Sequence, residues 1–123
     1  MLKSMFLAGM GGFVGTCLRF LVGRLCATYF PSFWPTGTMI ANLAGCLLIG
    51  ILCGLAQRTN LISTELNVLL IAGFCGGFTT FSSFSNETFQ MIQSRGVSTA
   101  LLYVLLSVVL GIGFVWLGRW LTE

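Results

Sequence analysis

Long apolar stretches separated by short polar turns dominate the sequence. Four of them approach or exceed the about 20 residues that a membrane-spanning helix needs, at positions 5–30, 38–56, 66–91 and 97–120. The separators are a proline-containing turn around Trp34, which suits an anchor at the membrane interface, and polar connections at residues 57–60 and 93–96. The pattern predicts an all-α integral membrane protein whose residues 1–123 form a single four-helix transmembrane domain.

The first apolar stretch shares one feature with signal peptides, because Lys3 supplies a positive charge ahead of it. It is longer than a signal peptide and contains Arg19 and Arg24, so we expect a retained helix. The connections between stretches are short. Neighbouring helices are therefore expected to be antiparallel, with both chain ends on one side of the membrane.

Composition indicates that lipid rather than water surrounds this chain. Of its 123 residues, 56% are hydrophobic and 7% are charged, whereas about a quarter of the residues in a soluble domain are charged. The same values exclude intrinsic disorder. The six basic and three acidic residues are scattered singly, so no basic cluster exists that would bind nucleic acid. The chain has no histidine, which removes the commonest proton shuttle, metal ligand and catalytic base.

The five cysteines all lie inside apolar segments, at positions 17, 26, 46, 53 and 75. Their number is odd and no pair has CxxC spacing. We interpret them as small apolar side chains within the membrane, with disulfide bonds or a metal site as the alternative.

Positive charge gives the predicted bundle almost no preferred orientation. The side of the chain ends carries three basic residues, Lys3, Arg58 and Arg119. The other side carries two, Arg24 and Arg95, and Arg19 lies deeper in its helix. Cytoplasmic loops normally carry an excess of Lys and Arg. Without that excess, we expect copies to insert in both directions and to pair as an antiparallel dimer. The alternative is that the small bias, or the insertion machinery, selects one orientation.

Small residues four positions apart indicate close contacts between helices. The pairs are Gly11 with Gly15, Ala41 with Gly45, Gly50 with Gly54, and Gly73 with Gly77. Because four helices bury little interior, these pairs favour at least a dimer.

Polar side chains inside the apolar stretches each need a reason, because they are costly in a membrane. Arg19 can pair with carbonyl groups, extend to the interface, or attract an anion; the first two stretches contain no acidic residue to neutralise it. Asn42 follows Thr38 at i, i+4, so an amide and a hydroxyl point the same way. They either join helices by hydrogen bonds or offer uncharged donors to a ligand.

Hydroxyl groups form a second polar face on the fourth stretch. Thr99, Tyr103 and Ser107 follow one another at i, i+4, and Gly111 continues the spacing. Such stripes more often join helices than line a pore. A second donor face in so small a protein nevertheless favours the pore interpretation.

The third stretch contains the most unusual segment, GGFTTFSSFS at residues 76–85. Its glycine pair lowers helix propensity, and the hydroxyls that follow compete for backbone hydrogen bonds. We therefore expect the third helix to break in mid-membrane. Carbonyls freed at the break must be buried or capped, and a cation is one solution.

Phe81 and Phe84 lie at i, i+3 after the expected break. Their spacing alone favours ordinary contact with the core or with lipid. Aromatic ring edges carry partial positive charge, however, so together with Asn42 and the hydroxyls they are able to meet a small anion that loses its water. Uncharged donors would also let the ion leave again, which conduction requires.

Three segments of the chain resemble the Fluc (CrcB) family of fluoride channels. They are GGFTTFSSFS at residues 76–85, GGFVG at residues 11–15 followed by Arg19-Phe20, and GTMIANLAG at residues 37–45. The resemblance covers essentially the whole chain, and the motif of the third stretch is highly specific.

The resemblance implies a dual-topology, antiparallel homodimer with two fluoride pores. Phe81 and Phe84 match the paired pore phenylalanines of the family, and Asn42 matches its pore asparagine. Arg19 matches the arginine of the family's vestibule.

Further site residues are implied by the same resemblance. Tyr103 and Ser107 match the polar track on the family's fourth helix, which here continues to a glycine rather than to another hydroxyl. Thr38 and Ser83 are additional pore candidates, and Glu87 lies one turn after Ser83 at the expected pore mouth.

The family also holds a structural sodium ion at the centre of its dimer. Backbone carbonyls at the helix break bind this ion. In the present chain we place these carbonyls at Gly76 and Thr79 of each subunit.

The resulting hypothesis is a fluoride-selective passive channel that exports cytoplasmic fluoride across the bacterial inner (plasma) membrane. Its expected partners are fluoride, sodium, the lipid bilayer and a second copy of the chain. A small multidrug-resistance-type exporter is the main alternative, but that class needs a carboxylate in its first helix and none precedes Gln57. A non-transporting membrane assembly subunit is a third reading. An enzyme is not expected, because no base lies beside the hydroxyls.

Overall fold

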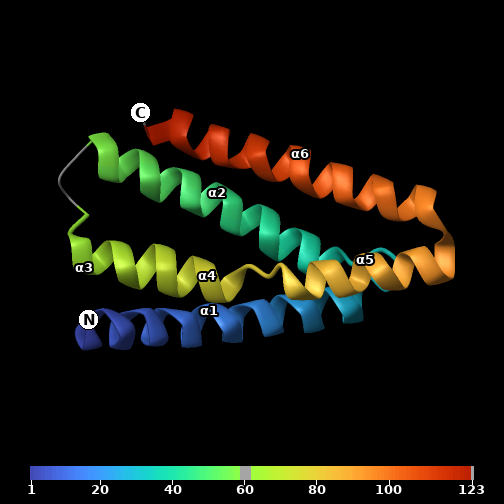
Figure 1. The fold of residues 1–123 in the computed structure, drawn as a ribbon, viewed down its shortest axis with the longest axis horizontal. Helices are drawn as coiled ribbons and strands as arrows, with labels where there is room; N and C mark the ends of the chain where they lie inside the picture. Colours follow the sequence, from blue (N-terminus) through green and yellow to red (C-terminus); the bar gives the residue numbers. More distant parts are fainter. Residues whose placement is uncertain (59–61, 123) are drawn as a thin grey trace.

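Every regular element in the described part of the chain is a helix (Figure 1). The computed structural model describes residues 1–58 and 62–122. Part of the predicted connection at residues 57–60 therefore lies outside the described residues. In chain order the elements are α1 (Leu2–Tyr29), α2 (Thr36–Arg58), α3 (Thr64–Asn67), the π-helical segment η1 (Val68–Cys75), α4 (Gly76–Phe78), α5 (Ser82–Arg95) and α6 (Val97–Thr122).

Four helical runs among the described residues are long and apolar enough to cross a membrane. They are Leu2–Tyr29, Thr36–Arg58, Thr64–Arg95 and Val97–Thr122. This confirms the predicted all-helical membrane architecture. Each run begins at, or a few residues before, the stretch expected from hydropathy, because polar residues at a helix end continue the hydrogen-bonded backbone without adding to the apolar signal.

The helices form an elongated bundle in which successive membrane-length runs are antiparallel, and both chain ends lie at the same end of it (Figure 1). α2 packs most extensively against α6, and α1 packs against η1 and α4. The third run thus lies beside α1, whereas α2 and α6 form the other pair.

Glycine allows the helix backbones to touch within a single chain. A Cβ atom at Gly11 or at Gly15 would collide with a backbone carbonyl of η1, and one at Gly73 would lie 2.7 Å from the Ala8 carbonyl oxygen. In the second helix pair, a Cβ at Gly118 would lie 2.5 Å from the Leu47 carbonyl oxygen. These glycine pairs are therefore used inside the chain, and they give no support to the prediction of a dimer.

The third run leaves helical geometry after Phe78, at the hydroxyl residues of the segment in which a break was expected. Gly76 and Gly77 remain helical in α4, and Thr79 is extended, with φ −93° and ψ 160°. Gly77 is needed for close packing instead, because a Cβ there would lie 2.9 Å from the Cα of Gly12. The helix resumes at Ser82. We call residues 79–81 the break.

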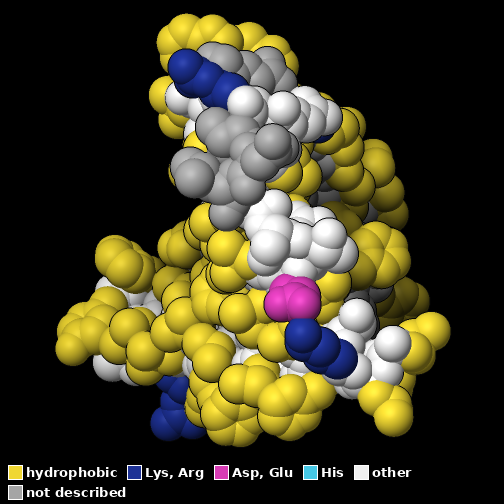
Figure 2. All heavy atoms as spheres, turned by 90° about the vertical axis from the view of Figure 1, so that its left-hand side faces the viewer, with side chains coloured by type: hydrophobic (Ala, Val, Ile, Leu, Met, Phe, Trp, Pro, Cys, Tyr) yellow, Lys and Arg dark blue, Asp and Glu magenta, His cyan; other side chains and the backbone are white. Residues whose placement is uncertain are grey.

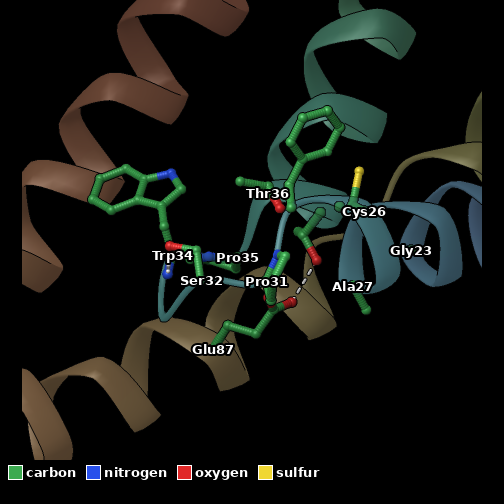
Figure 3. Close-up of a pocket in the computed structure, with 12 residues that line it drawn as sticks. Gly23, Cys26, Ala27, Pro31, Ser32, Trp34, Pro35, Thr36 and Glu87 are labelled. Carbon is green, nitrogen blue, oxygen red and sulfur yellow. Dashed lines mark hydrogen bonds between the residues drawn. The ribbon is translucent and has the colours of Figure 1, made fainter.

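Residues 30–35 connect α1 to α2 at the end of the bundle opposite the chain ends (Figure 1). The Trp34 carbonyl accepts the Thr36 N–H at 2.8 Å, and the Trp34 N–H donates to Ser32 Oγ at 3.1 Å. The Trp34 indole is half-buried and extends away from Glu87 (Figure 3). This turn places an aromatic residue next to α5 and α6.

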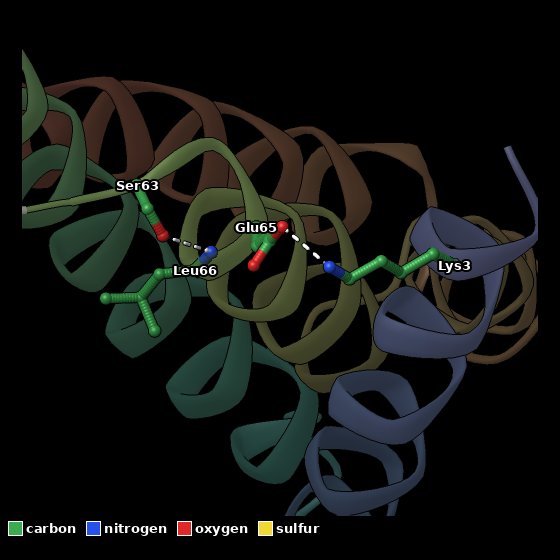
Figure 4. A network of polar contacts seen from close by, with 4 residues as sticks. All are labelled: Lys3, Ser63, Glu65 and Leu66. Carbon is green, nitrogen blue, oxygen red and sulfur yellow. Dashed lines mark hydrogen bonds and ion pairs between the residues drawn. The ribbon is translucent and has the colours of Figure 1, made fainter.

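Many large apolar side chains are exposed, as expected for a chain surrounded by lipid, and the face drawn in Figure 2 is mainly apolar. The buried core is correspondingly small. One cluster consists of Met91, Ala100 and Tyr103, with Trp34, Met39 and Phe84 packed against it. An exposed ion pair joins Lys3 Nζ to Glu65 Oε1 at 2.8 Å and ties the start of α1 to α3 (Figure 4).

The glycine contacts predict that Gly118→Ala destabilises the protein by about 1–3 kcal/mol, because the new methyl group has no room against α2. Gly113→Ala on the same helix is the matched control, since a Cβ there meets nothing within 4 Å. That variant should leave the stability unchanged or raise it by up to about 1 kcal/mol. Unfolding in detergent micelles measures both; equal midpoints for the two variants would contradict the packing described here.

Candidate functional site

The break is held by side chains from two other helices. Asn42 on α2 pairs with the backbone of Thr80: its Nδ2 donates to the Thr80 carbonyl at 3.0 Å, and its Oδ1 accepts the Thr80 N–H at 2.7 Å. One of the two amide hydrogens of Asn42 is used in this pairing, which leaves the other able to donate elsewhere. Asn42, a predicted pore residue, therefore holds the backbone at the break.

Arg19 supplies the second support. From α1, its Nε donates to the Gly77 carbonyl at 3.0 Å. In a continuous helix this carbonyl would accept the N–H of Phe81, which lies at the break. Arg19 was expected to pair with carbonyl groups, to extend to the interface or to attract an anion. The structure shows the first of these contacts.

Hydroxyl groups complete the bonding around the break. Thr79 Oγ1 donates to the Cys75 carbonyl at 2.8 Å. Thr80 Oγ1 accepts the Ser83 N–H at 3.2 Å and so satisfies a donor in the first turn of α5. These contacts end α4 and start α5 within three residues.

The same bonds release two backbone carbonyls from their helical donors. The Thr80 N–H, which would donate to Gly76 in a continuous helix, donates to Asn42 instead. The Ser83 N–H likewise donates to Thr80 Oγ1 and not to the Thr79 carbonyl. Gly76 and Thr79 are the two residues at which cation-binding carbonyls are expected, so the backbone fits such a role.

A pocket of about 350 Å³ lies beside the break and contains four of the predicted pore residues. They are Asn42, Phe81, Phe84 and Ser107. Cys46 and Val108 are among the other lining residues, so the pocket is mainly apolar with a few polar groups. Phe81 is 79% exposed, which means that one side of this pocket is open in a single chain.

The aromatic rings next to the pocket are in contact with one another. The ring centroids of Phe81 and Phe84 are 6.1 Å apart, with the planes tilted by 43°. Phe84 also contacts Tyr103, at 5.1 Å and 45°. Tilted rings direct some of their positive edges toward neighbouring space.

Two hydroxyl groups next to these rings are buried without a hydrogen bond. Within the part of the chain that the structure describes, neither Tyr103 Oη nor Ser107 Oγ has a partner. Tyr103 is fully buried. Leaving a buried hydroxyl unsatisfied costs about 1–3 kcal/mol, so both groups are suited to donate to a ligand.

A second pocket, of about 240 Å³, contains the predicted vestibule residue. Arg19 and Arg24 line it together with Thr38 and Thr80. Thr80 lines the first pocket as well, so both cavities border the break. Two guanidinium groups and no acidic side chain among these lining residues make the second pocket suitable for an anion.

Thr38 was expected to line the pore, but it makes a hydrogen bond to another side chain. Its hydroxyl donates to Glu87 Oε1 and so joins α2 to α5. Both residues line a third pocket of about 420 Å³ under residues 30–35, and Thr38 is absent from the lining of the pocket with the phenylalanines. Glu87, expected at the pore mouth, is therefore linked to a predicted pore residue.

The structure brings most of the predicted residues together, with some differences. Ser83 lies in the first turn of α5 and bonds Thr80 Oγ1 through its backbone N–H, and it is not among the lining residues of the three pockets described above. Thr80 and Arg24 were not predicted as site residues. Arg24 follows Phe20 at i, i+4, a spacing that places both side chains on one face of α1. The guanidinium carbon of Arg24 lies 5.9 Å from the centroid of the Phe20 ring. Nothing in the sequence indicates the pairing of Thr80 with Asn42.

Four apolar helices, a break bonded by partly buried side chains and a mainly apolar pocket with a few uncharged donors define a multi-pass integral membrane protein. A family model described as "CrcB-like protein, Camphor Resistance (CrcB)" matches residues 6–119. The chain belongs to this family, and the family resemblance seen in the sequence is confirmed.

Similar proteins with the name "Fluoride-specific ion channel FluC" match nearly the whole chain. The protein of Azobacteroides pseudotrichonymphae is 46% identical over 123 residues, which cover 100% of this chain and 98% of that protein. The Flavobacterium psychrophilum protein is 43% identical over 117 residues, or 95% of this chain and 94% of the relative. The Leptospira interrogans protein is 44% identical over 121 residues, or 98% of this chain and 95% of the relative.

The bonds at the break predict that Asn42→Ala lowers the free energy of unfolding by about 1–3 kcal/mol, because the Thr80 N–H and carbonyl lose their partners. Asn86→Ala, at an exposed position on α5, serves as the control and should change the stability little. Unfolding in detergent micelles measures the difference. A stable Asn42→Ala protein would mean that the break does not depend on this amide.

Proposed function

We propose that this chain forms a fluoride-selective passive ion channel that exports cytoplasmic fluoride, with two pores in an antiparallel, dual-topology homodimer. The observation that carries the proposal is the pocket at the break, where Asn42, the Phe81–Phe84 pair and the unpartnered Ser107 hydroxyl come together. The names of the relatives agree with it, since all three are fluoride-specific ion channels. The expectation that the chain is not an enzyme is confirmed by the same relatives.

The donor set suits a small, strongly hydrated anion. Fluoride loses its water only where compact donors replace it, and the second Asn42 amide hydrogen and the Ser107 hydroxyl are such donors in the pocket. Tyr103 does not line the pocket, but its ring contacts Phe84, and we propose that its hydroxyl is a further donor. None of them carries a full charge, so the ion is not trapped. A larger anion such as chloride makes poorer contacts with donors spaced for fluoride.

The phenylalanine rings would contribute by their edges. Phe81 and Phe84 are tilted at 43° to one another, so their positive edges are able to face an ion in the pocket. Their faces exclude water, which strengthens the contacts of the ion with the polar donors.

The second pocket is suited to collect anions from solution. Arg19 is held to the Gly77 carbonyl, whereas Arg24 is exposed and lines the same pocket. We propose that both charges attract fluoride toward Thr80, from which the first pocket is reached. A vestibule role for Arg19 is thus compatible with its structural contact.

A second copy of the chain would complete the site. Phe81 is 79% exposed although it lines the pocket, so another protein surface is needed to close the pore. The nearly even distribution of basic residues favours copies in opposite orientations. In that arrangement the break lies near the middle of the membrane.

A structural sodium ion at the centre of the dimer fits the released carbonyls. Gly76 and Thr79 of both copies would hold it, and its charge would balance carbonyl dipoles that lack their helical donors. The exposed position of Gly76 is compatible with an ion shared between two copies.

The direction of transport follows from gradients and not from residues. In an acidic environment fluoride enters a cell as neutral HF and ionises in the cytoplasm, so a passive channel in the bacterial inner membrane is sufficient for export. This function requires no coupling to another ion.

Fluoride efflux from liposomes containing the purified protein tests the proposal, with chloride efflux measured in parallel. We expect rapid loss of fluoride without loss of chloride. Phe81→Ile/Phe84→Ile should reduce fluoride efflux to the leak of protein-free liposomes, because the ring edges are removed from the pocket. Phe89→Ile, a 57% exposed position on the same helix, is the matched control and should conduct normally.

Absence of fluoride flux from a well-folded protein would exclude the channel. Export of an organic cation driven by a proton gradient would then indicate a multidrug-resistance-type exporter. A requirement for a second, different protein would indicate an assembly subunit.

Sodium dependence of stability tests the proposed ion. At constant ionic strength, replacing sodium by N-methyl-D-glucamine should lower the unfolding midpoint of the dimer. Above the dissociation constant, each tenfold increase in sodium should stabilise it by about 1.4 kcal/mol. A midpoint independent of sodium would argue against a bound structural ion.

A further inference from the structure

Trp34 is the outermost member of a continuous series of aromatic rings that leads to the pocket. Its centroid lies 5.4 Å from that of Tyr103, with the planes at 87°, which is an edge-to-face contact. Tyr103 then contacts Phe84 at 5.1 Å, and Phe84 contacts Phe81 at 6.1 Å. Residues 30–35, which lie outside the helices, thereby reach the rings that line the proposed pore.

The position of Tyr103 depends on this packing. Tyr103 is fully buried, and among the described residues its hydroxyl has no hydrogen-bond partner. No hydrogen bond therefore fixes the direction in which the phenol points. Trp34 and Phe84 contact the ring of Tyr103, while Met91 and Ala100 belong to the same core cluster.

Trp34 and its neighbour Phe33 each contact a residue outside the turn. Its indole Nε1–H donates to Met39 Sδ at 3.2 Å. The neighbouring Phe33 ring lies 4.2 Å from the guanidinium carbon of Arg95, at the end of α5. These contacts fix the turn against α2 and α5. A tryptophan that served only as an interfacial anchor would instead face the lipid headgroups. Figure 3 shows the indole directed away from the Glu87 side of the turn.

We propose that Trp34 is a positioning residue for ion permeation, which sets the orientation of Tyr103 and, through it, of Phe84. This inference rests on the proposed fluoride channel function. Trp34 does not line the pocket with the phenylalanines, so it would act only through the rings between. Its loss should leave the fold intact and misplace a donor hydroxyl and a ring edge.

The experiment compares Trp34→Leu with Trp34→Phe in liposomes, measuring fluoride efflux and the fluoride concentration at half-maximal rate. Loss of one aromatic pair corresponds to an about two- to tenfold change, so Trp34→Leu should slow efflux by that factor. Trp34→Phe keeps a ring edge against Tyr103 and should restore most of the rate. Trp116→Leu, at a 65% exposed position on α6, is the control for the loss of an indole.

A double-variant comparison tests the route of the effect. In a Tyr103→Leu background, Trp34→Leu should cause no further decrease, because the residue through which it acts is already absent. An additional decrease of the same factor would overturn the proposal, as would normal efflux by Trp34→Leu alone. If the unaltered protein conducts no fluoride, the proposed channel function is wrong. If the unaltered protein conducts but Trp34→Leu conducts equally well, only the positioning function of Trp34 is wrong.

A second pair of variants avoids the core altogether, in case Trp34→Leu does not fold. Phe33→Leu removes the ring under Arg95 and should release the turn, with slower efflux as the result. Phe30→Leu lies in the same turn at a 64% exposed position and should conduct normally. Equal rates for these two variants would overturn a positioning function for the turn.

Discussion

The pairing of Asn42 with Thr80 is the interaction on which the rest of the structure depends. A helix interrupted inside an apolar span exposes N–H and carbonyl groups that lipid cannot satisfy. One side-chain amide satisfies both groups of Thr80, and Arg19 bonds the Gly77 carbonyl from the opposite helix. These contacts make a stable break possible, and the break in turn places Phe81 beside the pocket instead of in a regular helical position. The glycine contacts between α1 and the third run bring Arg19 close enough to take part.

The polar groups of the chain divide into those that hold the backbone and those that remain able to bind a ligand. Arg19, Thr79, Thr80 and the oxygen of Asn42 belong to the first group. The Tyr103 and Ser107 hydroxyls belong to the second group, because burial has not given them a partner within the described chain. Ser107 lines the pocket beside the break, and the ring of Tyr103 contacts Phe84, which lines the same pocket. This distribution is the physical basis for treating the pocket as a site and not as a packing defect.

Hydropathy predicts the helical runs well, because length and apolar character alone decide whether a segment can cross a membrane. The segment at residues 76–85 was predicted to interrupt the third helix, and the irregular residues 79–81 lie inside it. They are at the hydroxyl residues and not at the glycine pair, because Gly77 is needed for close packing against Gly12. The partner of Asn42 lies 38 residues away, and no local pattern identifies it. For the same reason, the small-residue pairs indicated close helix contacts correctly but did not reveal that those contacts lie within one chain. The hydrogen bond from Thr38 to Glu87 also joins residues far apart in the sequence, so no local pattern predicts it.

The order of the chain has a consequence for biosynthesis. Both side chains that bond the break, Arg19 and Asn42, precede it in the sequence. Translation therefore produces both partners before residues 79–81. The interrupted segment does not depend on a later part of the chain to supply them. A rearranged gene that encoded the third run first would lack this advantage.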